Sequence, residues 1–273
     1  MALPARQERP QVPLMPELPE VETVRRALER HILGRRITSF AVGRPAFNRP
    51  IPRLALQRLK GSTILAVKRR GKYILLRLSR GRVLVCHLGM SGSVSFGRDE
   101  GHVRFQFTAG DRIVKFHDPR RFGRIDCSLP RLGPEPLSPA FTARELRRAL
   151  SRRKAPIKAL LLDQRIVAGL GNIYATEALF KAGIQPQRPA GRVSPAEAAR
   201  LCAAIKRVLR RAISVGGTTL ADQAFRDPEG RPGRFQLRTS VYGRKRGVCG
   251  HALKATPKPI AGRTSLYCPI CQR

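Results

Sequence analysis

A proline and glutamate segment near the N-terminus is the first place where residue types and spacing could support chemistry. Residues 15–20 read Met-Pro-Glu-Leu-Pro-Glu, so Pro16 precedes the carboxylates of Glu17 and Glu20. An unprotonated secondary amine forms an iminium with a carbonyl-like carbon, and nearby carboxylates can transfer protons. The same pattern is also an ordinary helix start, with Pro19 at the first helical position. The segment therefore indicates either amine catalysis or a capped helix.

A cluster of cysteines near the C-terminus is the second candidate for chemistry. Cys249 lies two residues before His251, and Cys268 and Cys271 form a C-x2-C pair. Thiolates and imidazoles bind structural zinc, usually as two such pairs, so three cysteines and one histidine can form a site despite the tight C-x-H spacing. The alternative is a zinc-free hairpin that is held by packing. The other cysteines are isolated, which indicates a reduced protein without a disulfide framework.

The charge balance narrows the class of partner. The chain of 273 residues has 54 Lys and Arg against 18 Asp and Glu, a net charge of +36. This exceeds what solubility requires and indicates a polyanionic partner, with nucleic acid as the first choice. A generally basic, arginine-rich proteome is the alternative explanation, and both can hold together. Charged residues interrupt every apolar run before about 18 residues, so we expect no membrane span.

The elements that position these groups fall into two domains of an α+β fold. Acids in the first turn and apolar residues at helical spacing predict an amphipathic helix over about 19–31. Short runs rich in Val, Ile, Leu and Phe, separated by turn residues between 37 and about 127, predict a β-sandwich or barrel. We expect residues 1–14 to be a disordered leader or the product of a mis-assigned start, 15–128 to form the sandwich domain, and the proline-rich segment 129–141 to be a linker.

Beyond the linker the apolar period becomes helical, which predicts a mainly α domain over 142–240. Its longest predicted helix runs from about Pro195 to Ser214 and ends at a pair of glycines. Residues 218–238 mix Gly, Pro and charges without periodicity, as expected of a mobile loop. We expect the cysteine-bearing tail, 241–273, to form a zinc-finger-like β-hairpin.

Seven ordered motifs give the chain a resemblance to a known family. They read MPELPEVETVRR, RRGKYILL, HLGMSGS, DPRRFG, GLGNIYATEALF, GGTTL and VYGRK, and they extend from residue 15 to the C-terminus. Together they resemble the formamidopyrimidine-DNA glycosylase family, whereas the related endonuclease VIII branch usually starts PEGPE. The resemblance implies a helix-two-turn-helix in the second domain. It also implies a bifunctional DNA glycosylase and abasic-site lyase that removes oxidised purines with β,δ-elimination.

The resemblance assigns the first candidate segment to catalysis. In the family, the proline amine attacks the sugar C1′ and forms a Schiff base, and Pro16 occupies that position. Glu17 and Glu20 match the family's two carboxylates, and Lys72 matches a hairpin lysine that contacts phosphate, although a lone lysine is more often a solvated turn residue. In a chain that starts at residue 1, Pro16 has an amide nitrogen without an available lone pair. We therefore expect translation to begin at Met15, or the leader to be removed before Pro16.

The resemblance also implies a set of residues that contact DNA. Glycosylases flip the damaged base out of the stack, and apolar wedges with a guanidinium can fill the gap. Without the family, the wedge candidates would be expected in the core, and the asparagine would be read as a helix N-cap. The wedge candidates are Met90, Phe122 and Arg120; the phosphate-side candidates are Lys154, Asn172, Tyr174 and Arg263; and Thr218 and Thr219, in the lid loop 218–238, are candidates for reading the base.

Together these observations predict an enzyme of base-excision repair whose partner is double-stranded DNA with oxidised bases or abasic sites. We expect a structural zinc ion at Cys249, His251, Cys268 and Cys271, a monomer, and a cytoplasmic, nucleoid-associated location. Three alternatives stay open: a lesion-binding protein without lyase activity, a basic nucleic-acid or ribosome-associated protein, and an endonuclease VIII-like glycosylase for oxidised pyrimidines. The PELPE start and the long loop after GGTTL weigh against the last of these.

Overall fold

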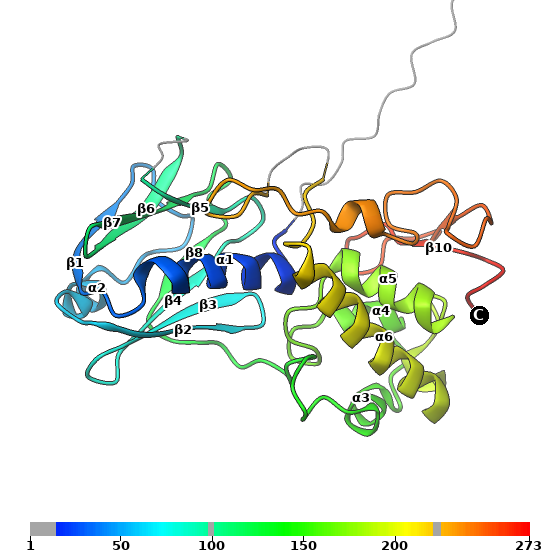
Figure 1. Ribbon diagram of the computed structural model, residues 1–273. Coiled ribbons are helices and arrows are strands. Elements are labelled where there is room, and N and C mark those ends of the chain that lie inside the picture. Colours follow the sequence, from blue (N-terminus) through cyan, green and yellow to red (C-terminus); the bar gives the residue numbers. More distant parts are fainter. Residues whose placement is uncertain (1–14, 98–100, 221–224) are drawn as a thin grey trace, which may run out of the picture.

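The structure is a computed structural model, and it describes residues 15–97, 101–220 and 225–273 (Figure 1). A β-sandwich lies at one end of the molecule and a group of helices at the other, with helix α1 running along the sandwich toward the helices. The expected leader, 1–14, lies outside the described residues. The predicted two-part α+β arrangement is confirmed.

Helix α1 spans Leu18–Ile32, close to the predicted 19–31. Pro19 stands in its first turn, and Glu20 Oε2 accepts a 2.9 Å hydrogen bond from the backbone N–H of Glu17. One face of the helix is buried, with Val21, Val24, Leu28 and Ile32 at helical spacing in the core. Burial of this face fixes the catalytic candidates at the end of the helix that points toward the helical domain.

Two four-stranded antiparallel sheets form the sandwich, as predicted. One sheet has the order β1-β6-β7-β5 and the other β2-β3-β4-β8. Their apolar residues alternate toward a shared core that includes the rings of Phe105 and Phe107. The strands are β1 (Ile37–Val42), β2 (Ile64–Arg70), β3 (Tyr73–Leu78), β4 (Val83–His87), β5 (Ser93–Phe96), β6 (Val103–Ala109), β7 (Arg112–His117) and β8 (Arg124–Asp126), and the short helix α2 (Arg53–Leu59) follows β1.

The helical part begins after an irregular, proline-rich segment that corresponds to the predicted linker. Its helices are α3 (Ala143–Leu150), α4 (Ile157–Leu162), α5 (Asn172–Ala182) and α6 (Pro195–Ser214). Helix α6 has the predicted bounds because Ser194 and Glu197 form a capping box at its start. The turns between α4 and α5 form the helix-two-turn-helix, and none of the described helices is long and apolar enough to cross a membrane.

The predicted lid loop is more structured than its sequence indicates. Residues 221–224 lie outside the described residues, but the remainder includes the 3-10 helix η2 (Phe235–Arg238). Phe225 and Phe235 are each 2 % exposed, and Thr219 Oγ1 donates a 2.7 Å hydrogen bond to the carbonyl of Phe225. Aromatic burial, which helical periodicity does not detect, explains this order. The tail forms the predicted hairpin, with strands β9 (Lys254–Ala255) and β10 (Leu266–Tyr267).

Candidate active site and nucleic-acid interface

Glu17 lies where the first domain meets the second. The backbone N–H of Leu18 donates a 3.0 Å hydrogen bond to the carbonyl of Gly169, and Glu17 Oε1 accepts a 3.0 Å hydrogen bond from Ile173 N–H. Ile173 is in the first turn of α5, so the carboxylate occupies the positive end of that helix. Gly171 permits this approach, since a Cβ there would lie 2.3 Å from the carboxyl carbon of Glu17.

The second oxygen of Glu17 has no partner. Glu17 is 2 % exposed, and Oε2 is one of the few buried side-chain oxygens in the described chain that lacks a hydrogen bond. Burial raises the pKa of Glu17, and the nearby charge of Lys72 opposes that shift. A buried carboxylate with a raised pKa at a domain junction differs from an ordinary surface acid.

Glu20 connects α1 to the start of the lid. Its Oε1 accepts a 2.7 Å hydrogen bond from Thr218 N–H and another from the hydroxyl of Tyr174, which lies 2.8 Å from Thr218 Oγ1. Burial, followed by the charge of Glu17, raises the pKa of Glu20 to about 7. Gly217 makes room for this contact, because a Cβ there would lie 2.7 Å from Glu20 Oε1.

This network differs from two expectations about side chains. Tyr174 was expected at the DNA surface, yet it is fully buried, and its ring packs 5.4 Å from that of Phe235. Thr218 and Thr219 were expected to read a base, yet both side chains are buried and hydrogen-bonded within the protein. The GNIY and GGTTL motifs contain the residues of this network that come from the second domain. They do not indicate that the two segments bond to each other across α1.

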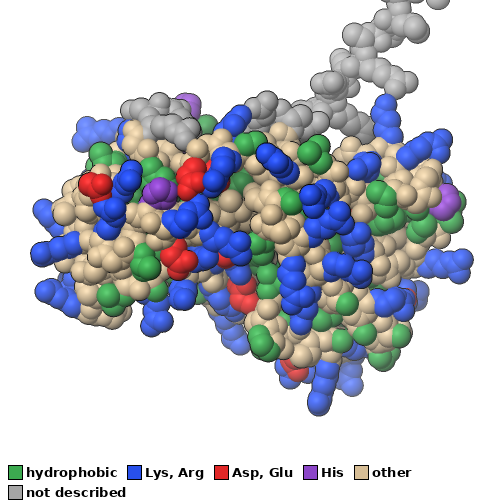
Figure 2. All heavy atoms as spheres, in the orientation of Figure 1, with side chains coloured by type: hydrophobic (Ala, Val, Ile, Leu, Met, Phe, Trp, Pro, Cys, Tyr) green, Lys and Arg blue, Asp and Glu red, His purple; other side chains and the backbone are tan. Residues whose placement is uncertain are grey.

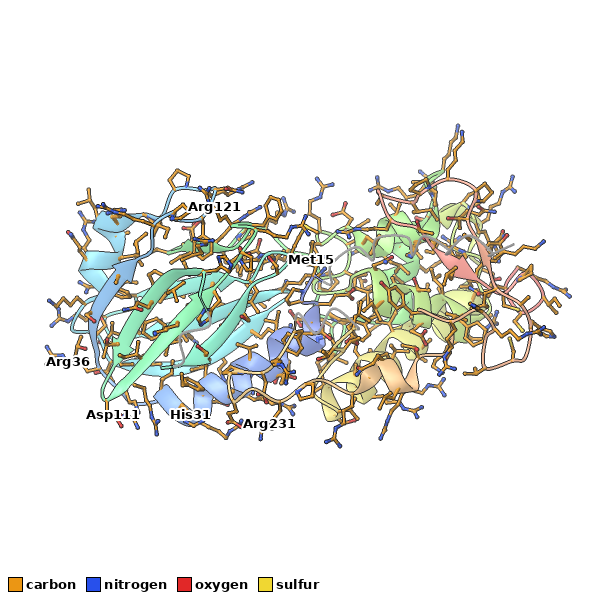
Figure 3. All side chains as sticks on the ribbon, turned by 90° about the horizontal axis from the view of Figure 1, so that it is seen from above. Met15, His31, Arg36, Asp111, Arg121 and Arg231 are labelled. Carbon is orange, nitrogen blue, oxygen red and sulfur yellow. The ribbon has the colours of Figure 1, made fainter. Side chains whose placement is uncertain are left out.

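Lys72 lies at the turn between β2 and β3, close to Met15. Its Nζ is 3.8 Å from the sulfur of Met15, and the side chain is largely buried. Burial lowers the pKa of Lys72, while the charges of Glu17 and Glu20 raise it and that of Arg263 lowers it further. Lys72 therefore lies within electrostatic reach of both carboxylates and of Arg263 in the C-terminal hairpin. Figure 3 shows Met15 between the sandwich strands and the helices, at the junction of the two domains.

The three wedge candidates lie on loops of the sandwich. Met90 is half-buried in the turn between β4 and β5. Phe122 is 45 % exposed, and the Arg120 guanidinium carbon lies 5.2 Å from the centre of its ring. An exposed aromatic ring covered by a guanidinium is a surface arrangement, not a core one. Figure 3 places Arg121, in the same loop, on the side of the sandwich opposite α1.

Asn172 and the finger are joined through a buried lysine. Lys158 Nζ donates hydrogen bonds of 2.7 Å to Asn172 Oδ1, 2.8 Å to Thr176 Oγ1 and 2.8 Å to Ser265 Oγ. Ser265 is two residues from Arg263, so this lysine connects the Asn172 side chain to the finger segment that carries Arg263. Burial lowers the pKa of Lys158 to about 7. Lys154 is exposed in the turn before α4 and does not belong to this group.

Lys158 and His87 are two residues of the site that motif comparison alone did not identify. The signal for Lys158 is a single lysine within the apolar run Ile157–Leu162. His87, at the end of β4, accepts a 3.0 Å hydrogen bond at Nδ1 from Gly89 N–H. Burial, with the charges of Lys72 and Arg124, lowers the pKa of His87 to about 3. The neutral ring therefore carries its proton on Nε2.

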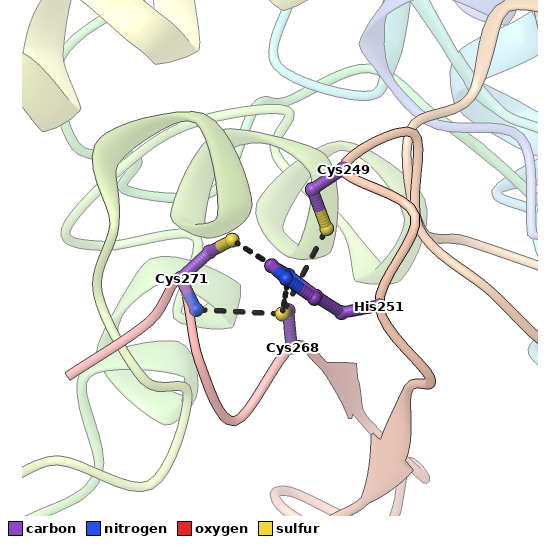
Figure 4. Close-up of side chains that lie close together, drawn as sticks. All are labelled: Cys249, His251, Cys268 and Cys271. Carbon is purple, nitrogen blue, oxygen red and sulfur yellow. Dashed lines mark hydrogen bonds between the residues drawn. The ribbon is translucent and has the colours of Figure 1, made fainter.

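The C-terminal cysteines and histidine converge as the sequence predicts (Figure 4). Cys249 Sγ lies 3.8 Å from Cys268 Sγ, and His251 Nδ1 lies 3.6 Å from Cys268 Sγ and 3.5 Å from Cys271 Sγ. Four ligands at the usual bond lengths around a tetrahedral zinc ion would be about 3.5 to 3.8 Å apart. All four ligand atoms lie within 4.8 Å of one another. The C-x-H spacing therefore fits a metal ion.

Positive charge extends beyond this junction. Figure 2 shows the face that carries α1 and α6, where Lys and Arg side chains are widespread and acidic side chains are few. Figure 3 shows that this face lies away from the Arg121 loop. The net charge of +36 is therefore not confined to the site, so charge alone does not locate a binding surface.

A sandwich joined to a helix-two-turn-helix and a finger, with a proline-led carboxylate pair at their junction, defines a DNA glycosylase of the helix-two-turn-helix class. The family models described as formamidopyrimidine-DNA glycosylase N-terminal domain and H2TH domain match residues 15–125 and 132–224. The chain therefore belongs to the formamidopyrimidine-DNA glycosylase family.

The chain is similar to individual members of this family over most of their length. The formamidopyrimidine-DNA glycosylase of Rhodospirillum rubrum is 49% identical over 86% of this chain and 89% of the relative. The crystal structure of the Thermus thermophilus protein is 45% identical, with a TM-score of 0.85 over 94% of this chain and 98% of that one. A Lactococcus lactis family member in complex with DNA that contains an abasic site has a TM-score of 0.81 at 31% identity, over 94% and 99% of the two chains.

Proposed function

We propose that the protein is a base-excision repair glycosylase with abasic-site lyase activity, acting on oxidised purines in duplex DNA. The observation that carries this proposal is the position of Glu17, which follows Pro16 and places its buried carboxylate at the start of helix α5, where the two domains meet. Relatives of the same architecture support it, since solved structures from Lactococcus lactis contain DNA with an abasic site or with a formamidopyrimidine lesion. The substrate is duplex DNA that carries 8-oxoguanine or formamidopyrimidine bases.

Pro16, Glu17 and Glu20 have separate roles in the proposed reaction. The amine of Pro16 attacks the sugar C1′, and the bond from C1′ to the damaged base breaks, so the base leaves with the bonding electrons and takes up a proton. Glu17 transfers protons during opening of the sugar ring, because burial raises its pKa and so favours a carboxyl group that holds a proton. Glu20 positions the segment through its bond from Glu17 N–H. The resulting Schiff base then permits β and δ elimination of the flanking phosphates.

The amine mechanism requires a chain whose first residue is Pro16. Within a longer chain its nitrogen is an amide and cannot act as a nucleophile. The family model match begins at residue 15, which supports translation from Met15 followed by removal of that methionine. We therefore propose that the active form begins at Pro16.

The DNA contacts follow from the placement of the loops. Met90, Phe122 and Arg120 enter the stack where the damaged nucleotide leaves it. Asn172 and Arg263, with Lys72 and the exposed Lys154, contact phosphates. Because Tyr174, Thr218 and Thr219 are buried, we assign them to holding the lid against Glu20, not to direct base contact. A DNA substrate implies a location at the nucleoid.

The metal at the finger is zinc in this proposal. Cys249, His251, Cys268 and Cys271 supply three sulfurs and one imidazole, a donor set that zinc favours. The ion would hold the hairpin that carries Arg263. It has no part in the reaction at C1′.

Trapping with borohydride tests the function. Protein that begins at Pro16 is incubated with a duplex containing an abasic site, and borohydride reduces the Schiff base to a stable adduct. We expect an adduct of one chain per lesion, and none from a chain that begins at Met1. Release of 8-oxoguanine from a matched duplex is measured in parallel with release of an oxidised pyrimidine. Absence of the adduct would support a lesion-binding protein, and preferential release of the pyrimidine would support endonuclease VIII-like specificity.

A further inference from the structure

One carboxylate of the interdomain segment binds the turn that carries Lys72. Glu135 Oε1 accepts hydrogen bonds from Gly71 N–H and, at 3.1 Å, from Arg69 Nη1, while Oε2 accepts a 2.8 Å bond from Arg69 Nη2. Arg70 Nη1 adds a bond of 3.2 Å to Oε1. Three successive residues before Lys72 are therefore bonded to a single side chain, which is 17 % exposed.

The segment that carries Glu135 is itself bonded to the turns before α5. The N–H of Gly133 donates a 2.9 Å bond to the carbonyl of Gln164, and the N–H of Ala168 donates a 3.1 Å bond to the carbonyl of Pro134. The carbonyl of the next residue, Gly169, accepts from Leu18 N–H. A continuous series of bonds thus connects the Lys72 turn to the residue that follows Glu17.

The turn is bonded to the backbone of the same segment as well, since Arg70 Nη2 donates hydrogen bonds to the carbonyls of Leu132, at 3.2 Å, and Gly133. Gly71 has a φ of +59°, and a Cβ there would meet Gly169 N and the side chains of Leu132 and Ala168 at 3.4 to 3.5 Å. Because glycine has no side chain, it lets the turn approach the second domain closely but adds no packing that would fix its position. Orientation of the turn therefore depends on hydrogen bonds to this segment, and Glu135 accepts four of them, including the bidentate pair with Arg69.

We propose that Glu135 is a positioning residue for Lys72, because it fixes the β2–β3 turn against the segment that holds Pro16 and Glu17. This inference rests on the proposed function, in which Lys72 contacts a phosphate beside the lesion. It assigns to the linker a role in the site, in addition to joining the domains. Loss of Glu135 should therefore remove the contact between Lys72 and the phosphate, although the lysine itself is unchanged.

Three variants of the protein that begins at Pro16 test this proposal: Glu135→Gln, Lys72→Met and the double variant. Binding to a duplex with a tetrahydrofuran abasic-site analogue is measured against salt concentration. One lost phosphate contact reduces the slope of log K against log salt by about 0.9. We expect Glu135→Gln and Lys72→Met each to cause this reduction, and the double variant to cause no further reduction. The cleavage rates should show the same lack of additivity.

Glu197→Gln is the matched control, because it breaks the partly buried pair between Arg188 and Glu197 at 2.6 Å, which involves none of the residues that hold the Lys72 turn. It should lower the unfolding temperature without changing the salt slope. If Glu135→Gln fails to fold, Arg70→Gln weakens the same turn more mildly and should give a smaller slope change. An unchanged slope in a folded Glu135 or Arg70 variant, or fully additive effects with Lys72→Met, would overturn the proposal. An unchanged slope in Lys72→Met itself would instead overturn the phosphate contact of the proposed function.

Discussion

Lys158 Nζ lies 2.8 Å from Ser265 Oγ, so a side chain of α4 is bonded directly to the finger. The same ammonium bonds Asn172 Oδ1 at 2.7 Å. Replacing Lys158 by methionine keeps an unbranched side chain as far as Cε but removes Nζ, so its three partners lose their donor. We expect Lys158→Met to weaken binding of lesion-bearing duplex about tenfold, as expected for loss of a charge-assisted hydrogen bond. Equilibrium binding measures this, with Lys60→Met, at an exposed lysine after α2, as the control, and equal effects of the two variants would contradict it.

Lys158 also predicts a dependence of stability on pH. Burial lowers its pKa from 10.5 to about 7 in the folded state. A depressed pKa on a lysine means that the unfolded chain binds more protons between these values, so the free energy of unfolding rises with pH from about 7 to about 10. That contribution is lost as the pH falls through 7. Denaturant unfolding of wild type and Lys158→Met measures it, and parallel pH curves for the two proteins would contradict it.

Tyr174→Phe removes one hydrogen bond from the carboxylate of Glu20. Because that bond favours the ionised form, its loss raises the pKa of Glu20 above its value of about 7. Ionised Glu20 accepts the hydrogen bond from Glu17 N–H that holds this segment in place. We therefore expect activity to fall as the pH drops below about 7, and the fall to begin at a higher pH in the variant. Single-turnover rates across pH measure the shift. Tyr267→Phe, in the finger, is the control and should leave the profile unchanged.

Gly171→Ala tests the close contact between the two domains. The added Cβ would lie 2.3 Å from the carboxyl carbon of Glu17, and the neighbouring backbone cannot yield without moving α5. A displacement of this size at a reacting group costs about 100-fold in rate. Gly97→Ala is the control, since its Cβ would meet nothing within 4 Å, although its φ of +75° carries strain. Similar activity in the two variants would show that Glu17 is not held as described.

Metal content tests the finger. We expect one zinc ion per chain, and removal by a chelator should lower both the unfolding temperature and DNA binding, because the hairpin carries Arg263. Cys268→Ser should have the same effect, whereas Cys127→Ser, a half-buried cysteine outside the cluster, should retain the metal. Metal analysis of the purified protein measures this. Full DNA binding by metal-free protein would show that packing alone holds the hairpin.

Local sequence signals predicted the elements well. Pro19 and the acids of the first turn give the start of α1, and Ser194 with Glu197 gives that of α6, because caps and periodicity act within a few residues. Convergence of Cys249 with Cys268 was also predictable, since few ligand sets suit a short hairpin. These interactions are short in range, or they are constrained by coordination chemistry.

Contacts between distant segments could not be predicted in this way. Nothing in the GNIY motif indicates that Tyr174 faces Glu20, because helix α5 is buried on nearly all sides and its apolar pattern has no exposed face to compare. Likewise, Glu135 stands in a proline-rich stretch that indicates only a linker. Its partners are 64 to 66 residues away in the sequence, so the bond exists only once the whole chain is folded.

The carboxylate of Glu17 belongs to one domain, yet it satisfies the N–H of Ile173 in the other. Each half therefore supplies a group that the other needs: separation would leave an acid without its donor and a helix without its cap. Such a junction restricts how the two halves can be exchanged between proteins. A recombination event that replaced either half with an unrelated one would lose the site, so the pair is expected to be inherited as a unit.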